Sequence, residues 1–281
     1  MKTLHQILIE YRATGKAIPA FNIDSFEIYQ AIEDSVKETG LPCIVQLSAG
    51  EDKFIHAERL FILVKKAQFD GLPIYLNMDH GQDQLRLEKL ISLGFDIVHF
   101  DGSKMDYSTN LEISQKFISN LKIHYPETLF EVEFDKINLV DSVVSKSSFT
   151  DPNKAYDFMT QTNADLLAVS IGNLHGVSLK LPEVIDLDLL SKIKNKIPED
   201  KFITLHGGSG INSDQLSQAI KLGVIKININ TELRNNFNHS LFQIYSKDFS
   251  QKIYENFSPA IDDLKNIIKS KLLLFSTSNY A

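Results

Sequence analysis

The sequence predicts an α/β protein of the (β/α)8 barrel class, formed as a single domain over residues 1–281. Eight short β-rich runs recur roughly 20 to 37 residues apart, about the length of one βα unit plus the next strand. An amphipathic helical stretch follows each polar turn. The runs are nearly continuous in apolar residues, which is typical of parallel strands covered on both faces. An open doubly wound sheet is the alternative, but the chain has neither a Gly-x-Gly-x-x-Gly fingerprint nor a P-loop.

Each predicted strand is bounded by turn residues and followed by a helical pattern. Leu85, Leu90 and Leu93 recur at helical spacing after the third strand, and Leu216 and Ile220 do so after the seventh. Eight such repeats are the number that closes a barrel. The predicted strands, in chain order, are Ile18–Phe21, Cys43–Leu47, Ile74–Met78, Ile97–Phe100, Leu129–Phe134, Leu166–Ser170, Phe202–Leu205 and Val224–Ile229.

Two segments depart from the repeat. The stretch Asp135–Asp151 is irregular and rich in serine, and it predicts a mobile loop over about 135–151. Such a loop at a barrel mouth is either a lid or solvent-exposed padding. Residues from about 258 to 276 predict a C-terminal helical segment, whose apolar Leu272–Phe275 end either closes the barrel or packs on another subunit.

Composition and charge exclude several classes of protein. A hydrophobic fraction of 43% with 23% charged residues argues against a disordered or fibrous chain. A net charge of −7 without a basic run argues against a nucleic-acid partner. The single Cys43 cannot form an internal disulfide, and no run approaches the roughly 18–20 apolar residues of a membrane span. We therefore expect a cytoplasmic protein with no membrane partner.

Histidines follow three of the predicted strands at their C-terminal ends, where barrels of this class place their chemistry. His80, His175 and His206 come after the third, sixth and seventh strands. One such histidine often only caps a loop, but three at one rim suit a zinc ion with an open fourth position. Sites of this kind also accept cobalt or other divalent ions. The other histidines are assigned to the surface or the core: His5, His56, His99, His124 and His239.

The segment from His206 to Gly210 predicts an anion-binding turn. Glycines let backbone N–H groups approach an anion, and a helix starting near Ser213 adds the positive end of its dipole. A second helix start follows Asn230 and Thr231, and phosphate sites after strands seven and eight recur in this fold. A Gly-Gly-Ser-Gly sequence by itself is more often a tight turn. Its place after a candidate metal ligand favours the anion site.

Taken together, the strand-end residues resemble the class II, metal-dependent fructose-bisphosphate and tagatose-bisphosphate aldolases. The matching segments appear in the order of the family and cover almost the whole chain. They are Ala20–Asn22, Asp79–His80, Asp101–Ser103, Glu131–Glu133, Phe149–Pro152, Leu167–Gly172, His175–Gly176, Leu205–Gly210 and Lys226–Glu232.

The resemblance implies reversible cleavage of a ketose 1,6-bisphosphate into dihydroxyacetone phosphate and glyceraldehyde 3-phosphate. It makes His80, His175 and His206 the ligands of a zinc ion, with Glu133 as its support or alternative ligand, and Asp79 the group that moves a proton at the C4 hydroxyl. It also implies a homodimer or homotetramer, with a monovalent cation near the phosphate as a common feature. The implied substrate-binding and phosphate-binding residues are Asn22, Ser48, Asp101, Ser103, Gly176, Gly207, Gly208, Ser209, Asn228, Asn230 and Thr231.

Several positions differ from the family pattern. Asn77 stands where the family usually has a histidine, and Asn230 stands where it has an aspartate. The loop after the fifth strand lacks the hinge glycines, and its proton-abstracting glutamate falls on Asp141, which is one methylene shorter. No arginine follows Arg234, so a lysine or Arg234 must bind the second phosphate.

Three alternatives remain open on the sequence. One is a different substrate, tagatose 1,6-bisphosphate or another ketose phosphate, because no residue decides the stereochemistry at C4. A second, raised by the altered loop, is a metal-binding barrel that has lost aldolase activity and has a binding or regulatory role. A third is a Schiff-base aldolase, disfavoured because no lysine lies on the sixth strand and Lys226, on the eighth, is predicted to bind an anion.

Overall fold

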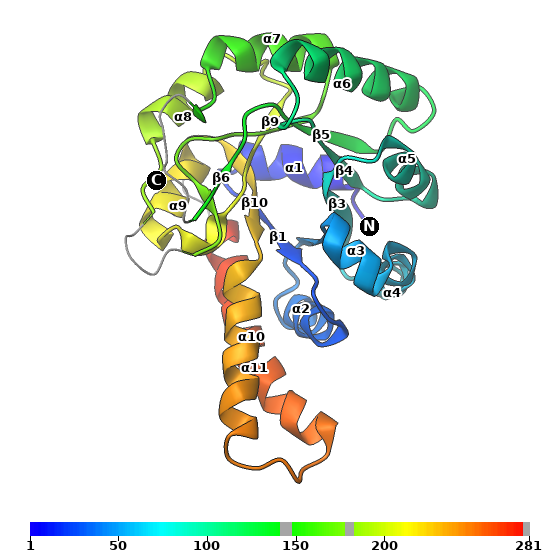
Figure 1. Cartoon of the computed structure of the whole chain (residues 1–281), viewed down its shortest axis with the longest axis vertical. Helices are drawn as coiled ribbons and strands as arrows, with labels where there is room; N and C mark the ends of the chain where they lie inside the picture. Colours follow the sequence, from blue (N-terminus) through cyan, green and yellow to red (C-terminus); the bar gives the residue numbers. More distant parts are fainter. Residues whose placement is uncertain (141–147, 178–182, 278–281) are drawn as a thin grey trace.

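Eight parallel strands form a closed barrel surrounded by helices in this computed structural model, which describes residues 1–140, 148–177 and 183–277 (Figure 1). Around the barrel the strands follow the order β1-β10-β9-β7-β5-β4-β3-β2. The predicted (β/α)8 barrel is therefore confirmed, and each predicted strand corresponds to one strand of the barrel. The strands are β1 (Ile18–Asn22), β2 (Cys43–Leu47), β3 (Ile74–Gly81), β4 (Ile97–Asp101), β5 (Leu129–Glu133), β7 (Leu166–Ala168), β9 (Phe202–Leu205) and β10 (Val224–Ile229).

Most of the described helices begin at a residue whose side chain caps free N–H groups. The Asp83 side chain accepts hydrogen bonds at the start of α5, and Asp151 does so at the start of α7, which has a proline in its first turn. None of the helices among the described residues is long and apolar enough to cross a membrane. The helices are α1 (Leu4–Ala13), α2 (Phe26–Thr39), α3 (Ala49–Ile55), α4 (Ala57–Phe69), α5 (Gln84–Leu93), α6 (Tyr107–Lys122), α7 (Pro152–Thr162), α8 (Leu187–Lys194), α9 (Ser213–Lys221), α10 (Thr231–Tyr245) and α11 (Ile253–Ser276), with a short 3-10 helix, η2 (Gly208–Gly210).

The barrel interior changes from apolar to polar along its axis. At the N-terminal ends of the strands, α1 packs its apolar side chains against residues such as Tyr75, Ile97 and Phe202 and closes the foot of the barrel. The sequence predicted strands that are apolar on both faces. In the structure they are continuously apolar only on the outer face, which packs against the helices. Above the foot, a layer of buried polar side chains fills the interior: Gln46, Asn77, His99, Glu131, Thr204 and Lys226.

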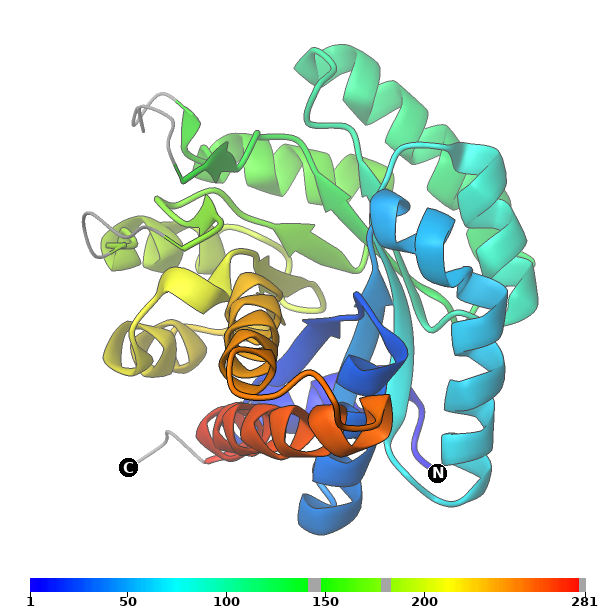
Figure 2. The same cartoon turned by 60° about the horizontal axis from the view of Figure 1, so that its bottom comes forward.

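The C-terminal helix α11 begins earlier than predicted, at Ile253, and carries Pro259 within its first two turns. It packs against α2 and α10, and both cartoons show α10 and α11 lying side by side (Figure 2). Leu264, Ile268 and Leu272 recur at four-residue spacing on its buried face. This face joins the core of its own barrel, whereas Leu273 is exposed.

The segment after β5 is more regular than the sequence indicated. Within it, β6 (Asn138–Leu139) pairs in parallel with β8 (Leu174–His175), and the Val140 backbone N–H donates to the His175 carbonyl at 3.1 Å. The chain after β5 is therefore attached beside His175. Residues 141–147 lie outside the described part of the chain. The mobility of the loop stays a prediction.

Candidate active site

A cavity of about 620 Å³ opens at the C-terminal ends of the barrel strands. Of the sequence-predicted site residues that the structure describes, only Gly208 does not line it. Asp141 lies outside the described residues, and Gly208 is buried under the cavity wall, where a Cβ would meet the Ile227 side chain at 2.6 Å. The predicted residues that line the cavity are Asn22, Ser48, Asp79, His80, Asp101, Ser103, Glu133, His175, Gly176, His206, Gly207, Ser209, Asn228, Asn230 and Thr231.

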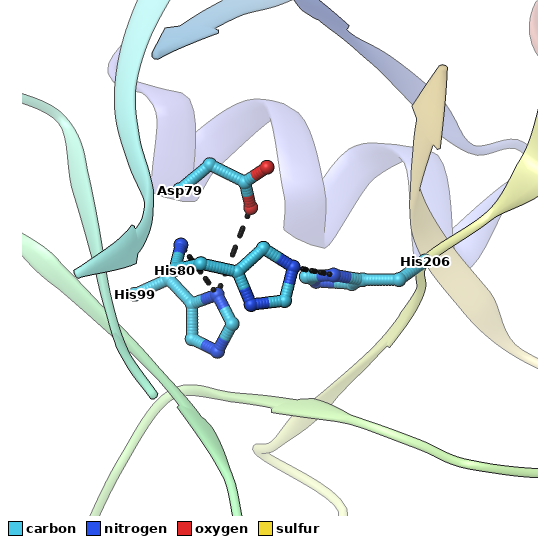
Figure 3. Close-up of side chains that lie close together, drawn as sticks. All are labelled: Asp79, His80, His99 and His206. Carbon is cyan, nitrogen blue, oxygen red and sulfur yellow. Dashed lines mark hydrogen bonds and ion pairs between the residues drawn. The ribbon is translucent and has the colours of Figure 1, made fainter. Parts of the chain in front are cut away.

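His80 and His206 point their rings at one another from β3 and from the end of β9 (Figure 3). His80 Nε2 and His206 Nδ1 are 3.0 Å apart. His80 reaches this position because the β3–β4 register shifts between Met78 and Gly81, and its own φ of 51° lies in the left-handed region. A non-glycine residue in this conformation is strained, and such strain is common at functional sites.

Buried carboxylates hold the far nitrogens of both rings. Asp101 Oδ2 lies 3.0 Å from His80 Nδ1, and Glu131 Oε1 lies 2.8 Å from His206 Nε2. In the neutral rings each of these nitrogens then carries the proton, so that the two facing nitrogens present lone pairs. Two nitrogens on one tetrahedral zinc ion lie about 3.3 Å apart, because each Zn–N distance is about 2.0–2.1 Å. The arrangement therefore fits a metal ion with carboxylate-oriented histidine ligands.

His175 and Glu133 complete the group of candidate ligands. The ring of His175 is 4.9 Å from that of His80, between centroids, and its buried Nε2 has no hydrogen-bond partner among the described residues. Glu133 Oε2 is also buried without such a partner, and it lies 3.7 Å from His80 Nδ1. An unpaired buried polar atom is costly unless something else binds it, and an ion beside the facing histidines would give His175 Nε2 such a partner. Glu133 lies on the Asp101 side of His80, where these three residues form a second group that could hold a metal ion.

Burial sets the protonation of these groups. Burial lowers the pKa of His206 to about 3 and that of His175 to about 4, so both rings are neutral, as metal ligands must be. Burial opposes the charged form of His80 as well, but Asp79 and Asp101 outweigh it and raise its pKa. Burial raises the pKa of Glu133 to about 8. His80 and Glu133 are therefore the members of the group that would have to lose a proton to bind a metal ion.

Asp79 lies beside the two histidines, held by amide groups. Its Oδ2 accepts hydrogen bonds from Gln46 at 3.2 Å and from Asn22 at 3.3 Å, and its Oδ1 accepts from Asn228 at 3.1 Å. Burial opposes ionisation of this carboxyl, but the neighbouring histidines and Lys226 outweigh burial and keep its pKa well below the usual value. Asp79 is thus a fixed, ionised acceptor next to the candidate metal ligands.

His99 is a member of the site that sequence reasoning placed only among surface or core residues. It is fully buried, its Nδ1 accepts the His80 backbone N–H at 3.1 Å, and the same nitrogen is 3.6 Å from Asp79 Oδ1 (Figure 3). His99 therefore supports the strained His80 backbone. The signal was available in the sequence, because His99 stands two residues before Asp101 and side chains two apart share a strand face.

A carboxylate beside the predicted phosphate turn was also missed. Glu51 of α3 accepts hydrogen bonds from the Ser48 backbone N–H at 2.6 Å and from Asn230 Nδ2 at 3.1 Å. Burial raises its pKa to about 7, with a further increase from Asp24. Asn230 is an amide where the resemblance implies an aspartate, and Glu51 supplies a carboxylate that this amide binds. The start of α10 and Ser209 face the same part of the cavity.

The expectation that Lys226 binds an anion is wrong. Lys226 is fully buried, it does not line the cavity, and its Nζ lies 2.9 Å from Glu131 Oε2. The residue stands in the polar layer of the barrel interior, too deep to meet a ligand at the mouth. Its position on the strand, four residues before Asn230, determines this depth.

Comparison with known proteins agrees with this geometry. The family model of class II fructose-bisphosphate aldolases matches residues 2–280. A fructose-bisphosphate aldolase of Ureaplasma parvum is 30% identical over 274 residues, covering 94% of this chain and 92% of the relative. One from Thermus caldophilus is 29% identical, covering 97% of each chain.

Solved structures show the same fold. The YdjI aldolase of Escherichia coli K12 superposes with a TM-score of 0.83 at 23% identity, covering 98% of this chain and 97% of that structure. A putative fructose-1,6-bisphosphate aldolase of Coccidioides immitis gives a TM-score of 0.84 at 21% identity, covering 98% and 96%. The match of the family model to residues 2–280 is supported by the His80–His206 pair at the barrel mouth. The chain belongs to the class II fructose-bisphosphate aldolase family.

Proposed function

We propose that this chain is a zinc-dependent aldolase that cleaves fructose 1,6-bisphosphate reversibly into dihydroxyacetone phosphate and glyceraldehyde 3-phosphate. The observation that carries the proposal is the pair of facing nitrogens on His80 and His206, 3.0 Å apart and next to the ionised Asp79. His80, His175 and His206 would hold the ion, with Glu133 as a further ligand. When bound, the ion supplies Lewis acidity for the ketone and for the charge that develops on C–C cleavage.

Asp79 is the proposed acceptor of the C4 hydroxyl proton in the cleavage direction, and the donor in the reverse direction. Three amide hydrogen bonds fix its carboxylate, so little reorganisation accompanies the transfer. Asp141 is the proposed partner that exchanges a proton with the dihydroxyacetone phosphate fragment. It follows directly after the segment in which β6 pairs with β8, which favours a place over the cavity mouth.

The dihydroxyacetone phosphate end is proposed to bind between η2 and α10. Ser209, Asn230 and Thr231 line this side of the cavity, and the Asn230 backbone N–H lies 3.2 Å from Ser209 Oγ. The first turn of α10 points its free N–H groups and its positive dipole end here, which suits a phosphate. A monovalent cation beside this phosphate and a homodimeric or homotetrameric state belong to the same proposal.

The second phosphate is proposed to bind Lys104 and Lys136. Both residues line the cavity, following β4 and β5, which stand four places from β10 and β1 in the eight-strand ring and therefore opposite them. Among the residues that the structure describes, the Lys104 Nζ has only a weak contact, 3.5 Å from Gln82 Oε1. Arg234 stands on α10, on the side of the first phosphate, and 3.9 Å from Asp24. The two lysines are thus the cations placed for the aldehyde end of the substrate.

The decisive test is cleavage of fructose 1,6-bisphosphate and of tagatose 1,6-bisphosphate by zinc-loaded protein, before and after chelation. We expect cleavage of the fructose sugar to be faster, to disappear with chelator and to return with zinc. Faster cleavage of the tagatose sugar would replace the substrate but keep the reaction. Failure to cleave either sugar, with metal content measured at one ion per chain, would overturn the proposal and favour a binding or regulatory role.

A further inference from the structure

The interior of the barrel contains a lysine that the proposed chemistry does not use. Lys226 of β10 is fully buried, and its Nζ donates a hydrogen bond to Asn228 Oδ1 at 2.8 Å and lies 2.9 Å from Glu131 Oε2. Removing an ammonium group from water costs several kcal/mol even when it is paired. Apolar residues of similar size fill such places in other layers of this barrel, so the charge calls for an explanation.

On one side, Lys226 is connected through Glu131 to the candidate metal ligand His206. Glu131 is fully buried and bridges the lysine to the histidine: one carboxylate oxygen lies 2.9 Å from Lys226 Nζ and the other 2.8 Å from His206 Nε2. The lysine fixes the carboxylate in place, and the carboxylate keeps the proton of His206 on Nε2. The lone pair of Nδ1 is then directed at His80.

On the other side, Lys226 leads to Asp79. The Asn228 amide has two orientations, related by a half-turn, that exchange its oxygen and its nitrogen. An ammonium group only donates, so Lys226 selects the orientation in which Asn228 Oδ1 faces it. The Nδ2 group then points the other way and donates to Asp79 Oδ1 at 3.1 Å. Without the lysine, the amide oxygen could turn toward the carboxylate and repel it.

We infer that Lys226 is a positioning residue that orients both halves of the site at once, His206 through Glu131 and Asp79 through Asn228. The inference rests on the proposed function for the role of Asp79, while the effect on His206 concerns metal binding alone. The contacts form one continuous series through the polar layer, from β9 across β5 and β10 to β3. The single buried charge of Lys226 therefore orients both the candidate metal ligand, His206, and the proposed proton acceptor, Asp79.

The test is Lys226→Met, which keeps the length of the side chain and removes its charge. We expect the affinity for Co²⁺, measured by competition with a chelator, to fall about 10- to 100-fold, as it does when groups that orient metal ligands are lost. The visible absorption spectrum of the Co²⁺ protein should change as well. In the cleavage assay, kcat should fall with KM little changed, because neither affected group binds the phosphates.

Lys201→Met is the matched control. Lys201 is another buried lysine, 7% exposed, whose Nζ donates to Asn163 Oδ1 at 2.7 Å, far along the fold from the site. This variant should lose stability while retaining Co²⁺ affinity and spectrum. A merely structural role for Lys226 predicts the same behaviour for both variants.

Two single variants separate the two sides of Lys226. Glu131→Gln should lower Co²⁺ affinity more than kcat at saturating metal, and Asn228→Ala should lower kcat while leaving Co²⁺ affinity nearly unchanged. If Lys226→Met fails to fold, the double variant Lys226→Met/Glu131→Gln removes both buried charges and should still lose Co²⁺ affinity. Retention of the affinity and spectrum in whichever of these lysine variants folds would overturn the inference. A wild-type protein that binds Co²⁺ but cleaves no sugar would contradict the proposed function and leave the His206 half of the inference testable.

Discussion

Each histidine of the facing pair has a carboxylate behind it, and the identity of that carboxylate determines which nitrogen faces the cavity. Asp101 binds His80 through Nδ1, and Glu131 binds His206 through Nε2. The two rings are therefore presented in opposite senses, and they meet because their strands approach from different sides of the barrel. At this scale the chemistry of the site follows from single hydrogen bonds to single ring nitrogens.

Asp79→Asn tests the proton transfer. The amide is isosteric with the carboxylate but cannot take a proton, so we expect kcat for sugar cleavage to fall at least about 100-fold, within the usual range for loss of a general base. Metal content, measured by elemental analysis, should stay at the wild-type level because Asp79 is not a proposed ligand. A variant with near-normal kcat would remove Asp79 from the mechanism.

The double variant Lys104→Met/Lys136→Met tests the second phosphate site. In the condensation direction we expect kcat/KM for glyceraldehyde 3-phosphate to fall about tenfold or more, because charge-assisted hydrogen bonds to the phosphate are lost. Condensation with unphosphorylated glyceraldehyde should change little. Lys116→Met, at an exposed position of α6 that pairs with Glu112, is the control. Equal losses for both aldehydes would place the second phosphate elsewhere.

At the scale of elements, the short strand β6 attaches the chain that follows β5 to the site. The β6–β8 pairing attaches it to the strand that carries His175. The residues that follow, including Asp141, are expected over the mouth.

Asp141→Ala tests this placement. We expect kcat to fall with metal content retained, and Asp141→Glu to keep most of the activity because it restores the reach of the family residue. Deuterium exchange at the carbon of dihydroxyacetone phosphate, followed by NMR, measures the step directly. Unchanged exchange in the alanine variant would show that another residue moves this proton.

A half-buried aspartate between α5 and β4 makes stability depend on pH. Burial raises the pKa of Asp96 to about 6, although its Oδ2 accepts the Leu76 backbone N–H at 2.8 Å. The folded pKa is above the unfolded value, so the stabilisation is complete below about pH 4 and is lost as pH rises through 6. The loss amounts to about 3 kcal/mol.

Asp96→Asn keeps an acceptor for the Leu76 amide and removes the charge. The free energy of unfolding, from urea titrations at pH 5 and pH 7.5, should therefore depend less on pH in the variant than in the wild type. The same dependence in both proteins would mean that Asp96 is ionised in the folded state without penalty.

The elements of this fold were more predictable than the depth of residues inside it. The spacing of β-rich runs identified all eight barrel strands, because each βα unit has a narrow range of lengths. The two-residue pairing of β6 and β8 depends on contacts between distant segments and leaves no local pattern. Most predicted site residues line the cavity because strand ends meet at one rim. His99 is buried, within the predicted surface-or-core assignment, but its contacts with His80 and Asp79 were not foreseen, and the role of Lys226 was misjudged, since both roles depend on the layer that the residue occupies.

At the scale of the whole molecule, the site concentrates negative charge that a divalent cation would balance. Asp79, Asp101, Glu131 and Glu133 are all buried around the histidines, and among the described residues Lys226 is the lysine that contacts this group, through Glu131. Proton uptake by His80 and Glu133 is the alternative way to neutralise the group. Protons and metal therefore compete.

Metal affinity should increase with pH. His80, whose pKa is raised, and Glu133, whose pKa is raised to about 8, must lose protons to act as ligands. Each proton displaced contributes up to about tenfold in affinity per pH unit below the pKa of its group, which for Glu133 means below about pH 8. Calorimetric titration with Co²⁺ in two buffers of different ionisation enthalpy measures the protons released. Loading should also raise the thermal midpoint, as binding to the folded state does. His206→Ala should show neither effect, and pH-independent affinity in the wild type would contradict the prediction.

The apolar N-terminal end of the barrel affects how a bound ion and a substrate can enter and leave. Leu4, Ile7 and Leu8 of α1 seal that end against the strands, so the described structure gives the polar interior access to solvent from the opposite end. An ion at the histidines and a sugar phosphate at the cavity mouth would then enter and leave through the same opening. The sugar would have to depart first, and the rate at which a chelator strips the ion should fall as the sugar concentration rises. The order in which sugar and ion leave would thus follow from the closure of the N-terminal end of the barrel by α1.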